Sequence, residues 1–166
     1  MSLLNNVDLV RVLLIVILLY LSYVDLRSFR LPDSITLPLI VAGMVFNLLS
    51  PSHYVDVTDS IIGSLMGYVS LWLLNYLYHL IKQQDGIGMG DAKLLAALGA
   101  WLGWSALPSI LLIASISGLI GGMIYLKWHK QNSCHAFPFG PFLAFAGIIE
   151  LLWPQNLLTF LLGNLT

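Results

Sequence analysis

Four acidic residues stand where a carboxylate could take part in chemistry. Each lies in or beside a strongly apolar segment, and they are Asp25, Asp33, Asp91 and Glu150. An ionisable side chain at membrane depth is energetically costly and is therefore a functional candidate by default. The other four acids fall in polar loops or near the N-terminus, where contact with water is a sufficient explanation: Asp8, Asp56, Asp59 and Asp85.

Asp25 and Asp91 form the pair best suited to catalysis. Asp25 stands in YVDLRSFRLPD at the end of one apolar run, and Asp91 opens another after the glycine-rich DGIGMG. Glycine permits close backbone approaches, which suits a site that admits another extended chain. Two carboxylates at short range cannot both ionise easily, so the pair can share a proton. One Asp can then deprotonate a water molecule while its partner protonates the carbonyl oxygen or the leaving amine.

Asp25 and Asp91 also have plain structural explanations. Asp25 can pair with Arg27 or Arg30 at the end of a helix, and spacing alone does not separate this from a catalytic role. Asp91 opens an apolar helix, so it can be a helix cap. Buried carboxylates also serve proton-coupled transporters, so that function stays open on these residues alone.

Asp33 and Glu150 have weaker claims to chemistry. Asp33 follows Pro32 and precedes an apolar run, which favours a helix N-cap whose carboxylate accepts backbone N–H groups. Glu150 lies in or near the last apolar segment, where it faces either the helix bundle or the outer interface.

The composition shows what kind of molecule must position these acids. Hydrophobic residues make up 58% of the 166 residues and charged residues only 9%, whereas about a quarter of a soluble domain is charged. This excludes a soluble fold, a disordered chain and a nucleic-acid binder with a basic face. The single cysteine, Cys134, excludes an internal disulfide framework. The four histidines show no i, i+4 spacing, so neither a metal nor a cofactor is expected.

Apolar runs of suitable length predict an all-α membrane protein of about six transmembrane helices in a single domain, 1–166. The second, fourth and sixth predicted spans are short. Gly63 and Gly67 give the third span the small-xxx-small spacing of a helix-packing face. The predicted spans are 9–26, 34–49, 58–81, 91–104, 108–126 and 138–153.

The distribution of basic residues predicts the orientation. With six spans, all the basic residues except Arg11 fall on one face: Arg27, Arg30, Lys82, Lys93, Lys127 and Lys130. Lys and Arg are in excess in cytoplasmic loops, so this face is predicted to be cytoplasmic, with both termini outside. Asp25 and Asp91 then lie at cytoplasmic ends of their spans. No internal repeat is found, which gives an inverted-repeat transporter little support.

Three blocks of the sequence carry a resemblance to a known family. They are DLRSFRLPDSITLPL (Asp25–Leu39), GIGMGDAKLLAALGAWLGW (Gly86–Trp104) and FPFGPFLAFAG (Phe137–Gly147). In this order they resemble the type IV prepilin peptidases, bacterial inner-membrane aspartic proteases of the GxGD class. The resemblance implies an enzyme that cuts the short basic leader of prepilins or pseudopilins at the cytoplasmic face. Such leaders end in Gly just before the hydrophobic helix of the mature pilin.

The resemblance also implies roles for individual residues. Asp25 and Asp91 match the two catalytic aspartates of the family. Lys93 matches the family's lysine after GxGD, and we interpret it as a lysine that snorkels to the interface. Asp33 matches the aspartate of L-P-D, as a supporting or capping residue. The motif glycines are Gly88 and Gly90.

One feature departs from the longer members of that family. Those carry an N-terminal extension with paired CxxC motifs, associated with N-methylation of the new pilin terminus. This chain begins at the first catalytic span and has only Cys134, which puts methyltransferase activity in doubt. Expected partners are prepilin or pseudopilin substrates and the lipid bilayer, without nucleic acid. The alternatives are a small proton-coupled transporter and a non-catalytic membrane protein of pilus assembly.

Overall fold

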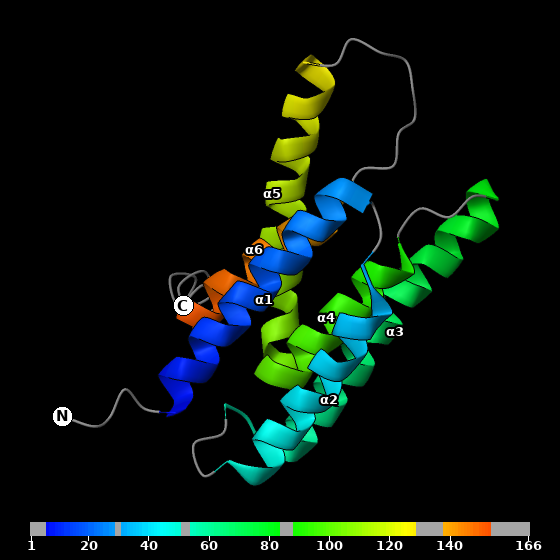
Figure 1. The fold of residues 1–166 in the computed structure, drawn as a ribbon. Coiled ribbons are helices and arrows are strands. Elements are labelled where there is room, and N and C mark those ends of the chain that lie inside the picture. The colour runs from blue at the N-terminus through cyan, green and yellow to red at the C-terminus, as the bar shows by residue number, and fades with distance from the viewer. Residues whose placement is uncertain (1–5, 29–30, 51–53, 84–87, 129–137, 154–166) are drawn as a thin grey trace, which may run out of the picture.

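The computed structural model describes residues 6–28, 31–50, 54–83, 88–128 and 138–153. This part of the chain forms six α-helices and one short 3-10 helix, η1 (Trp104–Ala106), with no β-strand (Figure 1). All six segments predicted as spans are helical, and their positions agree with the prediction to within a few residues. The α-helices are α1 (Asn6–Ser28), α2 (Asp33–Leu49), α3 (Val57–Lys82), α4 (Met89–Leu102), α5 (Leu107–Trp128) and α6 (Gly140–Leu152).

Proline and glycine set several of the helix ends. α2 begins directly after Pro32, which has the extended backbone that cannot continue a preceding helix. α4 ends at Gly103, whose φ of +80° is a value that residues with a side chain rarely adopt. The N–H of Gly103 bonds to the carbonyl oxygen of Gly99 at 2.9 Å. The chain therefore leaves α4 sharply and enters α5 through η1.

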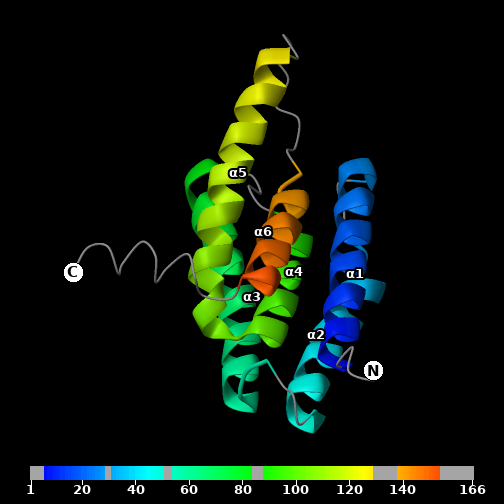
Figure 2. The same ribbon diagram turned by 90° about the vertical axis from the view of Figure 1, so that its left-hand side faces the viewer.

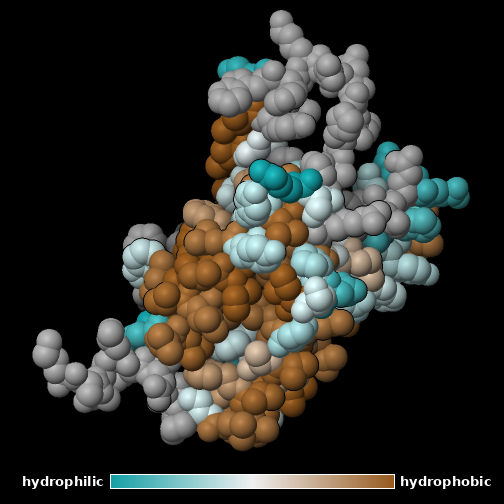
Figure 3. All heavy atoms as spheres, viewed as in Figure 1, coloured by the Kyte–Doolittle hydropathy of each residue, from teal (hydrophilic) through white to brown (hydrophobic). Residues whose placement is uncertain are grey.

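The lengths and surfaces of the helices are those of a membrane bundle. Three stretches are long and apolar enough to cross a bilayer: 8–28, 57–82 and 104–124. α2 and α6 are apolar but shorter, with 17 and 13 residues. Apolar side chains cover much of the surface in Figure 3. α1 contributes Leu9, Val12, Leu13, Val16, Leu19 and Leu26 to the exposed apolar set. The chain is thus an all-α membrane protein.

The six helices form two groups of three. α4 packs against α2 and α3, while α6 packs against α1 and α5. Figure 2 shows α6 between α1 and α5. The two groups meet chiefly where α4 contacts α6. We call α1, α5 and α6 the α6 group, and α2, α3 and α4 the α4 group.

Glycines bring α3 and α4 into direct backbone contact, as the small-xxx-small spacing predicts. A Cβ added to Gly67 would lie 2.7 Å from the carbonyl oxygen of Leu95, closer than real Cβ atoms approach. One added to Gly63 would clash with the backbone of Gly99. Such contacts favour helix association where the hydrophobic effect between helices is weak.

Asn47 ties α2 to α4 at the end of the bundle where α2 and α4 both finish. Its side-chain amide donates hydrogen bonds to the carbonyl oxygens of Ala100 and Trp101, at 3.0 and 3.3 Å. Its Oδ1 accepts the backbone N–H of Tyr54 at 3.0 Å. The indole Nε1 of Trp101 donates to the carbonyl oxygen of Leu39 at 2.9 Å. Asp25 and Asp91 lie at the opposite end of the bundle.

Candidate active site

The antiparallel arrangement brings Asp25 and Asp91 to the same end of the bundle. Asp25 lies in the last turn of α1, and Asp91 is the third residue of α4. Both are buried, with 5% of Asp25 and 7% of Asp91 exposed. One comes from the α6 group and the other from the α4 group, so the pair exists only because these groups meet.

Gly140, the first residue of α6, lies between the two carboxylates. A Cβ added to Gly140 would lie 2.6 Å from Oδ2 of Asp25 and 3.3 Å from Oδ1 of Asp91. Because both oxygens surround this one point, they can be no more than about 5.9 Å apart. A water molecule with hydrogen bonds of up to about 3.0 Å to each side can bridge oxygens within this limit.

The surroundings of the pair favour proton sharing. Asp25 and Asp91 interact electrostatically, and two buried carboxylates at this range cannot both ionise easily. Oδ2 of Asp25 is buried and has no hydrogen-bond partner within the described ranges. An unpartnered buried carboxylate oxygen is energetically costly, and such groups gather at functional sites. The arrangement can hold a proton and a water molecule between two acids.

The ion pair with Arg27 that offered a plain explanation for Asp25 is not formed. The Arg27 guanidinium carbon lies 5.0 Å from the centroid of the Tyr23 ring, in a cation–π arrangement. No ion pair joins Asp25 to Arg27 in the part of the chain that the structure describes. The other predicted partner, Arg30, lies outside the described residues.

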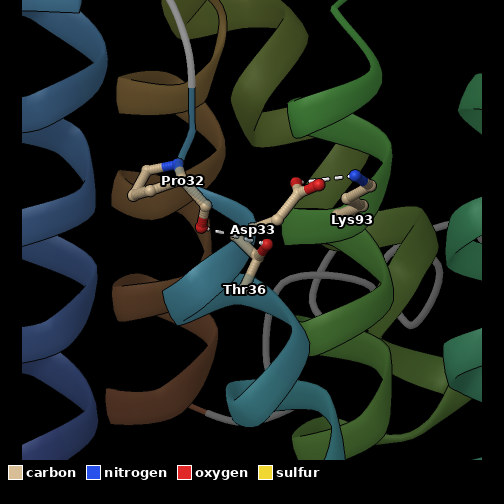
Figure 4. Close-up of polar contacts among 4 residues, drawn as sticks. All are labelled: Pro32, Asp33, Thr36 and Lys93. Carbon is tan, nitrogen blue, oxygen red and sulfur yellow. Dashed lines mark hydrogen bonds and ion pairs between the residues drawn. The ribbon is translucent and has the colours of Figure 1, made fainter.

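Asp33 and Lys93 bind each other beside the aspartates. Lys93 Nζ, on α4, donates to Oδ1 of Asp33 at 2.6 Å, as Figure 4 shows. The N-cap of α2 is Pro32, whose carbonyl oxygen accepts the Oγ1 hydroxyl of Thr36 at 3.3 Å. Asp33 is the first helical residue, so the prediction that it is the N-cap is wrong by one position. Lys93 therefore binds the Asp33 carboxylate, which the interpretation of Lys93 as a snorkelling lysine did not include.

The two motif glycines differ in what surrounds them. A Cβ added to Gly90 would lie 2.9 Å from Cβ of Leu31, in the short segment that precedes α2. Gly88 is the N-cap of α4, and a Cβ there would lie 3.6 Å from Oδ2 of Asp91, an ordinary contact. Gly90 therefore lets the start of α2 lie directly against the start of α4. Gly88 has room for a methyl group.

Glu150 faces the bundle at the other end of α6. It is 1% exposed and accepts a hydrogen bond from Oγ of Ser109, on α5, at 2.7 Å. With Arg11 and Tyr54 it lines a cavity of about 110 Å³. The structure does not bring Glu150 to the two aspartates. Among the residues described, no three His, Cys, Asp or Glu side chains come together as they would for a metal ion.

Gly140 is the residue of this site that the sequence analysis missed. It stands in the block FPFGPFLAFAG, which carried part of the resemblance, yet no role was predicted for it. The available signal was Gly140 followed by Pro141, since proline is favoured in the first turn of a helix. That signal predicts a helix start, but it does not predict that the start of this helix contacts Asp25 and Asp91.

Comparison with known proteins gives the family. Residues 12–123 match the model of the type IV leader peptidase family. A relative from Aeromonas salmonicida (strain A449), named prepilin leader peptidase/N-methyltransferase, is 46% identical over 151 residues, covering 90% of this chain and 50% of the relative. Relatives with the same name from Pectobacterium carotovorum subsp. carotovorum and Legionella pneumophila are 40% and 41% identical, covering 84% and 89% of this chain and 50% of each relative.

These matches cover most of the present sequence but not most of its relatives. The chain spans about half the length of the curated relatives it matches. No solved structure matches it. The family match includes α2 to α4 whole and the parts of α1 and α5 that lie between residues 12 and 123, and therefore both Asp25 and Asp91. The chain belongs to the type IV leader peptidase family.

Proposed function

We propose that this chain is a membrane aspartic endopeptidase that cleaves the short basic leader from type IV prepilins or pseudopilins. The observation that carries the proposal is the meeting of Asp25 and Asp91 around Gly140, buried at one end of the bundle. Membership of the leader peptidase family supports it, as does the name shared by the relatives. The proposal covers residues 1–166 as one peptidase domain that needs no metal or cofactor.

In the proposed reaction, the two carboxylates share one proton and hold a water molecule. The ionised Asp removes a proton from the water as its oxygen attacks the scissile carbonyl carbon. The protonated Asp gives its proton to the carbonyl oxygen, which produces a neutral gem-diol. When the C–N bond breaks, the Asp that received the water proton gives it to the leaving amine, and the other Asp takes back a proton from the gem-diol. The new carboxyl remains on the leader. Because water is the nucleophile, no covalent enzyme intermediate forms.

The location that we propose is the bacterial inner membrane, with the dyad toward the cytoplasm. Arg27, Lys82, Lys93 and Lys127 lie at the ends of helices that finish or begin on the side of Asp25 and Asp91. An excess of basic residues is typical of the cytoplasmic side. The start of α1 then faces the periplasm. The substrate would enter as a membrane or interfacial helix, with its leader at the cytoplasmic surface.

The proposal includes the peptidase activity alone. The name of the relatives also includes N-methyltransferase, and that activity is left to experiment. Supplying S-adenosylmethionine in the cleavage assay and weighing the product tests this part directly.

The test is cleavage of several purified prepilins by the purified chain in detergent, followed by mass spectrometry. Wild type is compared with Asp25→Asn and Asp91→Asn, with Asp8→Asn as the matched control. Asp8 lies in the first turn of the helix that carries Asp25, with its side chain half exposed. We expect a cut after the leader glycine by wild type and Asp8→Asn, and a loss of at least about 100-fold in each dyad variant.

Two results would contradict the proposal. Full cleavage by either folded dyad variant would remove that aspartate from the reaction. Failure of the wild-type chain to cut any prepilin, combined with proton flux in liposomes that depends on Asp25 and Asp91, would favour the proton-coupled transporter.

A further inference from the structure

The start of α6 points at the candidate dyad. The first N–H groups of a helix have no partner within the helix and must find one elsewhere. The N–H groups of Phe142 and Leu143 bond to the carbonyl oxygen of Phe139, at 3.1 and 3.2 Å. Pro141 has no N–H. Gly140, at the start of this turn, lies directly against the Asp25 carboxylate.

The same residue leaves the space that the carboxylates occupy. An alanine at position 140 would put a methyl carbon 2.6 Å from Oδ2 and 3.0 Å from Cγ of Asp25, and 3.3 Å from Oδ1 of Asp91. The first two distances are too short, so the carboxylate of Asp25 would have to move. Both carboxylates are buried, and the displaced group would have little free space.

The contacts of α6 with the two helices that carry the aspartates give this position its importance. α6 packs on α1, which carries Asp25, and contacts α4, which carries Asp91. Gly140 touches both side chains from a helix that contacts both α1 and α4. We infer that Gly140 is a positioning residue of the dyad, because its missing side chain leaves the space in which the two carboxylates meet. The catalytic meaning of this inference rests on the proposed function.

The first test compares Gly140→Ala with Gly147→Ala. Gly147 lies on the same helix, and a Cβ there would come 2.5 Å from Cδ2 of Leu98, the movable end of an apolar side chain. We expect Gly140→Ala to lower kcat for prepilin cleavage by at least about 100-fold, the size of an acid–base contribution, with KM changed less than about threefold. Gly147→Ala is expected to lower stability, because Leu98 is also buried, but to keep both constants within about threefold of wild type per folded molecule.

A pH profile separates positioning from simple loss of folded enzyme. Two close carboxylates share a proton, and moving one of them changes how they share it. Gly140→Ala therefore shifts the pH dependence of kcat, whereas a smaller folded fraction lowers the whole curve without moving it. An unmoved profile, or equal losses in the two alanine variants, would overturn the inference.

A cross-linking test does not depend on cleavage or on the fate of Gly140→Ala. In a Cys134→Ser background, Asp25→Cys is combined with Gly140→Cys or, as control, with Gly147→Cys. The added Cβ at 140 lies 3.0 Å from Cγ of Asp25, near where the sulfur of a cysteine would lie, and disulfides join Cβ atoms about 3.5–4.5 Å apart. Position 147 is seven residues farther along the helix, about 10 Å away.

We expect oxidation to form a disulfide in the 25/140 variant and not in the 25/147 variant. Mass spectrometry after alkylation shows the disulfide, because its two cysteines do not react with the alkylating reagent. A 25/140 pair that stays reduced, or a 25/147 pair that oxidises equally, would overturn the inference even if the chain cleaves prepilins. A wild-type chain that cleaves no prepilin would instead overturn the proposed function. The cross-linking result would still test whether residues 25 and 140 lie together.

Discussion

Lys93 Nζ donates a 2.6 Å hydrogen bond to Oδ1 of Asp33, which links the first turn of α2 to the helix that carries Asp91. The Asp33 side chain is 58% exposed and that of Lys93 23%. Pairs this exposed contribute about 0–1 kcal/mol to stability. Lys93 comes two residues after Asp91, so the pair holds the start of α4 beside the start of α2. Its main effect should therefore be on activity rather than on folding.

Removing either partner of this pair should slow prepilin cleavage several-fold while changing the free energy of unfolding by less than about 1 kcal/mol. The measurement is a double-mutant cycle with Asp33→Asn, Lys93→Met and the double variant. Because the residues act through one contact, the double variant should be no slower than the slower single variant. Losses that simply add would show that the two side chains act separately.

Gly90→Ala should lower the cleavage rate at least about tenfold, because its Cβ would lie 2.9 Å from Cβ of Leu31 and push the start of α4 away from α2. Overpacking of this kind costs typically about 1–3 kcal/mol. Gly88→Ala is the matched control, with a nearest contact of 3.6 Å, and should stay within about threefold of wild type. Equal losses in the two variants would contradict the structure around Gly90.

Asn47→Ala should destabilise the bundle by about 2–4 kcal/mol, because it removes three hydrogen bonds from a side chain that is 3% exposed. Thermal unfolding in detergent measures the change. Ser70→Ala is the control, since Ser70 is exposed and its hydroxyl donates to the carbonyl oxygen of Gly67 in its own helix. It should shift the free energy by less than about 0.5 kcal/mol. A stable Asn47→Ala variant would show that the α2–α4 contact does not depend on this amide.

Ser109→Ala should destabilise the protein by about 1–3 kcal/mol, because Glu150 loses its 2.7 Å hydrogen bond in a buried position. Cleavage per folded molecule should stay within about twofold of wild type. Glu150 lies ten residues along α6 from Gly140, about 15 Å from the dyad end. Abolished cleavage in a folded Ser109→Ala variant would mean that both ends of α6 belong to the site.

Local signals were enough to predict the helices and the two principal acids. Pro32 marks the position directly before α2, and apolar runs of adequate length mark the other spans. Asp25 and Asp91 attract attention because each stands at the end of such a run. Their common end of the bundle follows from counting spans, since helices of alternating direction place the end of the first and the start of the fourth on one side.

Contacts between distant parts of the chain could not be predicted in this way. The partner of Lys93 lies 60 residues earlier, and Gly140 meets Asp25 only because α6 packs on α1. α6 is apolar on most of its surface, so its hydrophobic pattern gave no face by which to orient Glu150. The local sequence predicts a helix start near Asp33, which suggested that its carboxylate caps the helix. It could not show that Lys93, on another helix, binds this carboxylate instead.

The order of helices along the chain has a consequence for biosynthesis. The ribosome delivers α1 before the other five described helices, and α2, α3 and α4 can then assemble with one another as they enter the membrane. The main packing partner of α1 is α6, the last helix of the described chain. Asp91 is therefore in place early, while Asp25 gains its final surroundings only when α6 inserts beside it. If the chain acts as proposed, a nascent chain has no peptidase activity until α6 has inserted beside α1.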